Sequence, residues 1–185
     1  MGRGCMSELT AAPAFSGMEN IGSGSGVHAA SREYAIVSVL ARKGHAQALM
    51  EKAGLVDAPH QSGTDGVTAL GIGPGRWLFI GKPLEQLAPL ADFASLSDHS
   101  DGYAVFEVWG PKVREALAKG VSVDLHPSVF TDNVAVTVIA HIGAIIWQSA
   151  PDRFSIAVFR SYAGSFWHWL GASAAEYGLT VKEPA

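Results

Sequence analysis

The stretch GIGPGRW has glycines at alternate positions, Gly71, Gly73 and Gly75, which superficially suggests a phosphate-binding loop. A dinucleotide-binding loop, however, has the pattern G-x-G-x-x-G and opens a helix whose N-terminal amides meet the pyrophosphate. Here the glycines lead into RWLFIG, a short apolar run typical of a strand. The stretch therefore predicts a hairpin turn rather than a phosphate site.

The stretch LSDHSDG brings Asp98, His99, Ser100 and Asp101 together in the sequence. These residue types form catalytic triads, but a working nucleophile, base and orienting carboxylate usually come from separate elements. Asp and Ser directly before a strand more often hydrogen-bond to their own backbone. We therefore expect a structural turn here.

The stretch VDLHPSVF holds Asp124 and His126, followed by Pro127. A residue before a proline is biased toward extended backbone, which would let Asp124 or a main-chain carbonyl fix the His126 ring. This arrangement favours a structural clasp over catalysis.

The single cysteine and the other histidines give no metal-site pattern. Cys5 has no companion, so neither an internal disulfide nor a structural zinc site is expected. No H-x-H or H-E-x-x-H spacing occurs among the remaining histidines, which are His28, His45, His60, His141 and His168. We predict that the chain contributes no catalytic, cofactor-binding or metal-binding residue.

The composition disfavours several classes of function. The net charge is −4 without any Lys/Arg-rich run, which argues against nucleic acid as a partner. The longest apolar run, VAVTVIAHIGAIIW, is too short to cross a membrane as a helix and predicts two buried strands. The N-terminus lacks the apolar block of a signal peptide, so a cytoplasmic location is expected. Charged residues form only 16% of the chain, which predicts a surface partly covered by other chains.

The order of apolar segments predicts an α+β fold. Residues 1–32 are rich in Gly, Ser and Ala and predict a flexible N-terminal tail. Residues 33–180 are expected to form a single compact domain of two duplicated halves, about 33–95 and 96–180. Each half reads as strand, helix, hairpin and helix, which is typical of a ferredoxin-like unit.

A short internal match supports the duplication. GPGRWLFIG aligns with APDRFSIAV, so that Arg76 meets Arg153 and Trp77 meets Phe154. The alternative is a chance match within an ordinary α+β chain. The agreement in element order favours two tandem ferredoxin-like halves.

The last predicted helix runs between Ser161 as N-cap and Gly178 as C-cap. At 100° per residue, one arc of this helix is apolar and predicts a core face; it holds Tyr162, Phe166, Trp169, Leu170, Ser173 and Tyr177. The opposite side is rich in small residues. A surface helix rich in Ala and Gly is one interpretation; a face that contacts a partner chain is the other, and we favour it. The predicted contacts are Trp167, His168, Gly164 and Gly171.

Three segments together resemble a known family: GPGRWLFIG, SDHSDGYAVFEVWGPKVREALAKGVSVDLHPSVF and PDRFSIAVFRSYAGSFWHWL. Over about residues 33–180, the chain is similar to the gamma subunit of bacterial heterotetrameric sarcosine oxidase. A more distant similarity, from Ser97 to Gly120, is to the aminomethyltransferase of glycine cleavage. The resemblance implies an aminomethyltransferase-like, folate-binding fold without the extra C-terminal domain of that enzyme.

The resemblance also implies a complex with alpha, beta and delta subunits. Such a complex oxidises the N-methyl group of sarcosine, yielding glycine, hydrogen peroxide and a one-carbon unit for tetrahydrofolate. FAD, FMN, NAD and the folate site would lie on the alpha and beta subunits and zinc on delta, while gamma would supply contacts rather than catalytic groups.

Three alternatives stay open at this point. The chain could be the small subunit of a related N-methyl amino acid dehydrogenase, such as N-methylglutamate dehydrogenase. It could be a stand-alone folate-binding aminomethyltransferase-like protein. It could also be a small binding module with an open pocket between its halves, which a core filled by Trp77, Phe154, Phe166 and Trp169 would disfavour.

Overall fold

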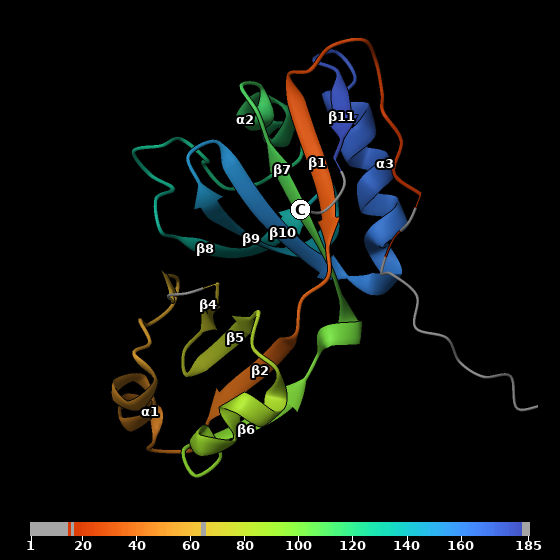
Figure 1. Cartoon of the computed structure of the whole chain (residues 1–185). Helices are drawn as coiled ribbons and strands as arrows, with labels where there is room; N and C mark the ends of the chain where they lie inside the picture. The colour runs from red at the N-terminus through yellow and green to blue at the C-terminus, as the bar shows by residue number, and fades with distance from the viewer. Residues whose placement is uncertain (1–14, 16, 64–65, 183–185) are drawn as a thin grey trace, which may run out of the picture.

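The chain forms two β-sheets packed face to face, with helices on their outer sides (Figure 1). The computed structural model describes residues 15, 17–63 and 66–182. The six-stranded sheet has the strand order β11-β1-β7-β10-β9-β8, and the five-stranded sheet has the order β3-β4-β5-β2-β6. A mixed α+β fold, as predicted, is confirmed.

The five-stranded sheet is built from the first half of the chain. Its strands are β2 (Ile36–Ala41), β3 (Gln61–Ser62), β4 (Thr68–Gly73), β5 (Arg76–Ile80) and β6 (Ala94–Asp98). Its outer side is covered by the helix α1 (Ala46–Ala53) and the 3₁₀ helix η1 (Leu84–Leu90). All neighbouring strands in this sheet are antiparallel.

The six-stranded sheet combines the second half of the chain with one N-terminal strand. Its strands are β1 (Val27–Arg32), β7 (Tyr103–Trp109), β8 (Val134–Ile139), β9 (Ile142–Ala150), β10 (Arg153–Phe159) and β11 (Leu179–Val181). The helices α2 (Val113–Ala118) and α3 (Ala163–Ala174) cover its outer side. Two short 3₁₀ helices, η2 (Ser100–Gly102) and η3 (Arg160–Tyr162), precede β7 and α3.

Strand β5 illustrates why the strands of this fold are apolar on both faces. Trp77 and Phe79 point toward α1 and η1, whereas Leu78 and Ile80 enter the core between the two sheets. A strand covered on both sides reads as a continuous apolar run because neither face meets water. RWLFI is such a run after its first residue.

The predicted hairpin turn is confirmed, and one helix end uses a glycine in the same way. The glycines of GIGPGRW form the turn between β4 and β5, in which Gly75 has a φ of 64°. Gly54 ends α1 in the left-handed conformation, with a φ of 62°. Glycine suits both positions because it has no Cβ to clash at positive φ.

The prediction of a flexible tail over residues 1–32 is wrong at its end, because residues 27–32 form β1. This strand lies between β7 and β11, and its Val27, Ala29 and Ala30 are completely buried. The Gly/Ser-rich residues before β1 favoured a single tail up to residue 32, so this short strand was not predicted. Residues 1–14 of the predicted tail, with Cys5, lie outside the described residues.

Two further predictions need correction. The second helix expected in the first half forms the 3₁₀ helix η1 instead of an α-helix, and Pro89 lies inside it; proline lacks the N–H that an α-helix interior uses. The apolar run that predicted two buried strands forms β8 and β9, but Val136 and Val138 of β8 are 61% and 46% exposed. Strand β8 is the last strand of its sheet, so one of its faces is only partly covered.

Candidate subunit interface

Helix α3 turns its largest rings into the core beneath the six-stranded sheet. Phe166 and Leu170 are completely buried, and the Phe166 ring lies 4.9 Å from that of Phe106 on β7. The Trp169 ring packs over Gly120, where any Cβ would come within 2.5 Å of it. The core face predicted for this helix is confirmed at these positions.

Part of the small-residue side of α3, at Trp167 and Gly171, is covered by the chain's own N-terminal segment. Trp167 is only 7% exposed, because its ring lies 6.2 Å from Phe15 and 6.3 Å from Phe106. Met18 and Ile21 pack on the same core. A Cβ at Gly171 would lie 2.5 Å from Cδ1 of Ile21, so the missing side chain is what lets that residue approach.

The prediction that Trp167 and Gly171 face outward is therefore wrong for the single chain. The helical periodicity places Trp167 and Gly171 on one side of α3, but it carries no information on which distant segment covers that side. His168 and Gly164 are exposed as predicted. Tyr162, predicted as core, is 50% exposed, because it lies in η3 before α3 begins.

A buried carboxylate that the sequence reasoning missed lies at the centre of the six-stranded sheet. Glu107 on β7 is 8% exposed and accepts hydrogen bonds from Arg32 (3.1 Å), Tyr34 (3.1 Å) and Arg153 (3.2 Å). Burial raises the pKa of Tyr34 above its ordinary value, and the negative charge of Glu107 adds to the effect. The Arg153 guanidinium also stacks 4.3 Å above the Trp109 ring.

This cluster holds elements together rather than exposing a reactive group. A buried charge is stable only when it is paired and hydrogen-bonded, and here two guanidinium groups and a phenol supply the partners of Glu107. The three partners lie 75, 73 and 46 residues from Glu107, so no local motif reveals them. The available signal was a lone glutamate inside the apolar strand YAVFEVW.

The turn predicted in LSDHSDG is confirmed. The Ser100 N–H and hydroxyl both donate to Asp98 Oδ1, at 2.9 and 2.6 Å, and these bonds lower the pKa of the Asp98 carboxyl. The Ser100 hydroxyl oxygen in turn accepts the Ile36 N–H of β2 at 3.0 Å. The cluster thus joins β6 to the start of β2 and is structural.

The structural role predicted for VDLHPSVF is confirmed, but the prediction that Asp124 or a main-chain carbonyl fixes the His126 ring is wrong, because Ser128 holds the ring. Asp124 accepts the backbone N–H of His126 at 2.8 Å rather than bonding its ring. The ring Nδ1 lies 2.7 Å from the Ser128 hydroxyl and accepts the Ser128 N–H at 3.2 Å. Both side chains therefore stabilise their own loop.

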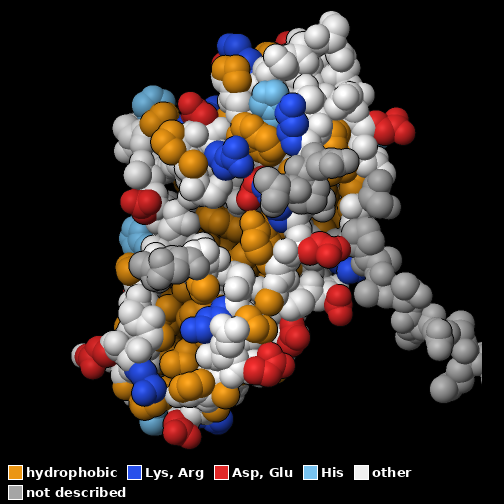
Figure 2. Space-filling model, viewed as in Figure 1, with side chains coloured by type: hydrophobic (Ala, Val, Ile, Leu, Met, Phe, Trp, Pro, Cys, Tyr) orange, Lys and Arg blue, Asp and Glu red, His pale blue; other side chains and the backbone are white. Residues whose placement is uncertain are grey.

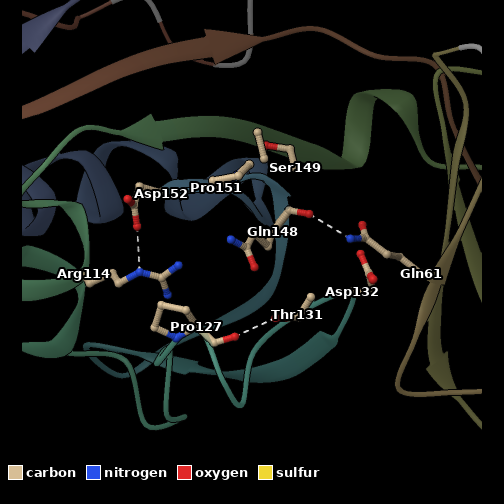
Figure 3. Close-up of a pocket in the computed structure, with 10 residues that line it drawn as sticks. Gln61, Arg114, Pro127, Thr131, Asp132, Gln148, Ser149, Pro151 and Asp152 are labelled. Carbon is tan, nitrogen blue, oxygen red and sulfur yellow. Dashed lines mark hydrogen bonds and ion pairs between the residues drawn. The ribbon is translucent and has the colours of Figure 1, made fainter.

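An open pocket of about 510 Å³ lies where the two halves of the chain meet (Figure 3). Arg114 reaches into it from α2 and donates through Nε to Asp152 at 2.8 Å, while its guanidinium stacks 4.9 Å from the Phe154 ring. From the opposite side, the Gln61 amide donates to the Gln148 carbonyl at 2.8 Å. The described residues that line the pocket include no histidine, cysteine, serine–histidine pair or lysine. Its groups therefore join Gln61 to β9, and α2 to the turn between β9 and β10, without supplying a nucleophile and base.

No three side chains of His, Cys, Asp or Glu in the described part of the chain gather closely enough to hold a metal ion. In the same part of the chain, no helix is long and apolar enough to cross a membrane.

Residues 72–176, more than half of the chain, match the model of the sarcosine oxidase gamma subunit family. The chain belongs to that family. The predicted resemblance is thereby confirmed, and the matched region contains both the Asp124–His126 clasp and helix α3.

Two curated relatives are themselves sarcosine oxidase gamma subunits. The chain is 31% identical over 120 residues to that of Corynebacterium sp. strain P-1, covering 61% of this chain and 59% of the relative. It is 26% identical over 119 residues to the gamma subunit of Corynebacterium sp. strain U-96, and this match covers 60% of this chain and 58% of the relative. The matched segment thus spans less than two thirds of the length of these relatives.

Solved structures support the fold over a larger part of the chain. The heterotetrameric sarcosine oxidase of Corynebacterium sp. U-96 contains a chain with a TM-score of 0.75 and 22% identity, covering 89% of this chain and 91% of that one. The glycine cleavage aminomethyltransferase T of Bartonella henselae gives a TM-score of 0.59 at 10% identity, covering 86% of this chain and 48% of that one. The fold of this chain is therefore shared with a part of the aminomethyltransferase.

Proposed function

We propose that this chain is the non-catalytic gamma subunit of a heterotetrameric, flavin-dependent sarcosine oxidase. The complex would demethylate sarcosine oxidatively to glycine, transfer the one-carbon unit to tetrahydrofolate and release hydrogen peroxide in the cytoplasm. The observation that carries the proposal is the family match over residues 72–176. The similarity in fold to a chain of the Corynebacterium heterotetramer supports it.

In this proposal the chain acts in structure and assembly. The polar groups that could do chemistry are occupied by local bonds: Asp98 by Ser100, Asp124 by His126, and Glu107 by two arginines and Tyr34. FAD, FMN, NAD and tetrahydrofolate would lie on the alpha and beta subunits and zinc on the delta subunit. The chain would contribute none of these sites.

We retain His168 and Gly164 as proposed contacts with a partner subunit, because both are exposed on α3. Trp167 and Gly171 would act indirectly, by holding the N-terminal segment through Phe15 and Ile21. The partner would then meet that segment together with the exposed positions of the helix.

We also propose that the two halves are tandem ferredoxin-like units. The five-stranded sheet contains the order β4-β5-β2-β6, and the other contains β9-β10-β7 with β11 beyond the inserted β1. The hairpins β4–β5 and β9–β10 support this equivalence of the two halves. The second strand of each hairpin, β5 or β10, begins at an arginine, and a completely buried ring follows it, Trp77 or Phe154.

Coexpression with the other subunits tests the function. A tagged chain is expected to retain alpha, beta and delta subunits, identified by mass spectrometry, and the purified complex should release hydrogen peroxide from sarcosine while the chain alone should not. N-methylglutamate with a dye as electron acceptor is the matched assay for the related dehydrogenase. A chain that binds flavin and oxidises sarcosine by itself would contradict the proposal.

A stand-alone folate-binding protein is the second candidate, and its support is the likeness to aminomethyltransferase T. The chain matches only 48% of that enzyme, so a large part of the enzyme has no counterpart in the match. Calorimetry with tetrahydrofolate decides between the candidates. Binding by the isolated chain would favour the second, whereas binding by the assembled complex alone would favour the first.

A further inference from the structure

The outer edge of strand β8 is partly unpaired. Val134 and Ala140 direct their N–H groups away from β9, since these donate to the carbonyls of Pro59 (2.6 Å) and Gly120 (3.1 Å). Outward and inward groups alternate along a strand, so the N–H groups of Val136 and Val138 also point outward. Within the described residues, neither of these two groups has a backbone acceptor beyond the sheet.

The side chains of this edge are apolar and exposed. Val136 and Val138 lie on the same face of β8 as Val134, which is buried in the core between the two sheets. That core therefore continues into a strip that the five-stranded sheet does not cover. A hollow of about 280 Å³ adjoins the strip, lined by Val136, Ile72, Pro74 and Asp57.

Acidic side chains predominate around the edge, although Arg114 lines the same pocket as Asp132. From Gly120 to Asp152, with both ends included, the sequence has three aspartates and no lysine or arginine. Asp132 is exposed two residues before β8, and Asp57 is exposed beside the hollow. A second copy of the chain would bring acidic groups against acidic groups, whereas a basic segment would complement them.

We propose that a short extended segment of a partner subunit, with alternating apolar residues flanked by lysine or arginine, adds to β8 as a further strand. Its backbone would pair with the N–H groups of Val136 and Val138, and its apolar side chains would cover the two valines. The proposal rests on the proposed function in one respect, that the chain is held in a complex. The face of the molecule seen in Figure 2 has a hydrophobic hollow between the two sheets, consistent with a core that is open at its margin.

Hydrogen exchange of the β8 amides, measured in the chain alone and in the purified complex, tests the proposal. We expect slower exchange at Val136 and Val138 in the complex. Val136→Pro removes one outward N–H at an edge position where proline is tolerated, and should weaken subunit retention about tenfold, as expected for a lost hydrogen bond and apolar contact. Val136→Thr keeps the N–H and removes apolar surface, so a smaller loss is expected. Thr137→Val, on the opposite face, is the matched control and should leave retention unchanged.

The outcomes separate this proposal from the proposed function. A complex that forms with unchanged exchange at β8 would overturn the added strand and leave the function intact. A concentration-dependent dimer of the chain that Val136→Pro abolishes would identify a second copy as the occupant and also overturn it. If no partner copurifies, the proposed function fails, and peptide binding to the isolated chain then tests strand addition at β8. The chain alone should bind acetyl-Lys-Val-Thr-Val-Lys-amide in preference to the same peptide with Glu in place of both Lys residues. Equal binding, or none, would reject the proposal.

Discussion

At the residue scale, Glu107 shows how a charge can lie inside an apolar strand. Its carboxylate is satisfied by Arg32, Tyr34 and Arg153, which come from two segments far from it in the sequence, the end of β1 and the start of β10. Removing one partner of a buried charge is costly, because the remaining charge stays desolvated. The cluster therefore fixes β1 and β10 against β7 in one register.

Tyr34→Phe should change how stability depends on pH. Burial and the Glu107 charge raise the pKa of Tyr34 above 10, so the phenol stays neutral in the folded chain while it ionises in the unfolded one. The contribution of the neutral Tyr34 phenol to the free energy of unfolding is therefore fully present below about pH 10 and is lost as the pH rises beyond that value. At neutral pH the variant should lose about 1.5–3 kcal/mol of unfolding free energy, the value of one hydrogen bond to a charged group.

Urea unfolding at about pH 8 and about pH 11 measures this effect. The native chain should lose more stability between the two conditions than Tyr34→Phe does, and the exposed Tyr162→Phe should behave like the native chain. Burial also raises the pKa of Tyr103, so part of the alkaline loss should remain in the variant. Identical losses in all three proteins would show that Tyr34 is not the group responsible.

At the element scale, α3 is buried on two sides by different parts of the chain. The six-stranded sheet covers one side through Phe106, and the N-terminal segment covers the other through Phe15 and Ile21. The absence of lysine and glutamate from this helix follows, since only a narrow face meets water. His168 lies on that face.

Alanine substitutions along α3 should separate these faces. Phe166→Ala and Trp167→Ala should each lower the free energy of unfolding by about 3–5 kcal/mol, the usual cost of truncating a buried ring. His168→Ala should change it by less than about 0.5 kcal/mol, as for an exposed position. Guanidinium unfolding of the isolated chain is the measurement. An unchanged free energy of unfolding in Trp167→Ala would contradict the conclusion that Phe15 covers Trp167.

At the scale of the whole molecule, the core between the sheets joins the two halves. Leu78 and Ile80 of one sheet pack with Val105, Ile145 and other apolar residues of the second sheet. The Gln61 amide adds a hydrogen bond to the Gln148 carbonyl at the margin of this junction (Figure 3). We therefore expect the halves to unfold together.

Leu78→Ala should lower the stability of both halves. The side chain is almost fully buried between the sheets, and its truncation should cost about 2–5 kcal/mol. Circular dichroism and tryptophan fluorescence should still report one coincident transition, and hydrogen exchange should accelerate in β4–β5 and β9–β10 alike. Val56→Ala, at an exposed position, is the control. Acceleration confined to β4–β5 would show that the halves are independent.

The sequence by itself determined the features that depend on neighbouring residues. The turn at Gly75, the cap at Gly54, the Asp98–Ser100 turn and the core side of α3 all follow from local geometry and periodicity, and the family was recognisable from its motifs. Tertiary structure alone decided what covers Trp167, that residues 27–32 form a strand inside the second sheet, and which groups surround Glu107. Each of these depends on contacts between segments far apart in the chain, and such contacts leave no periodic pattern in the sequence. The exposed edge of β8 has the same origin: Val136 and Val138 look like core residues in sequence, and only the place of β8 at the end of its sheet leaves them in contact with water.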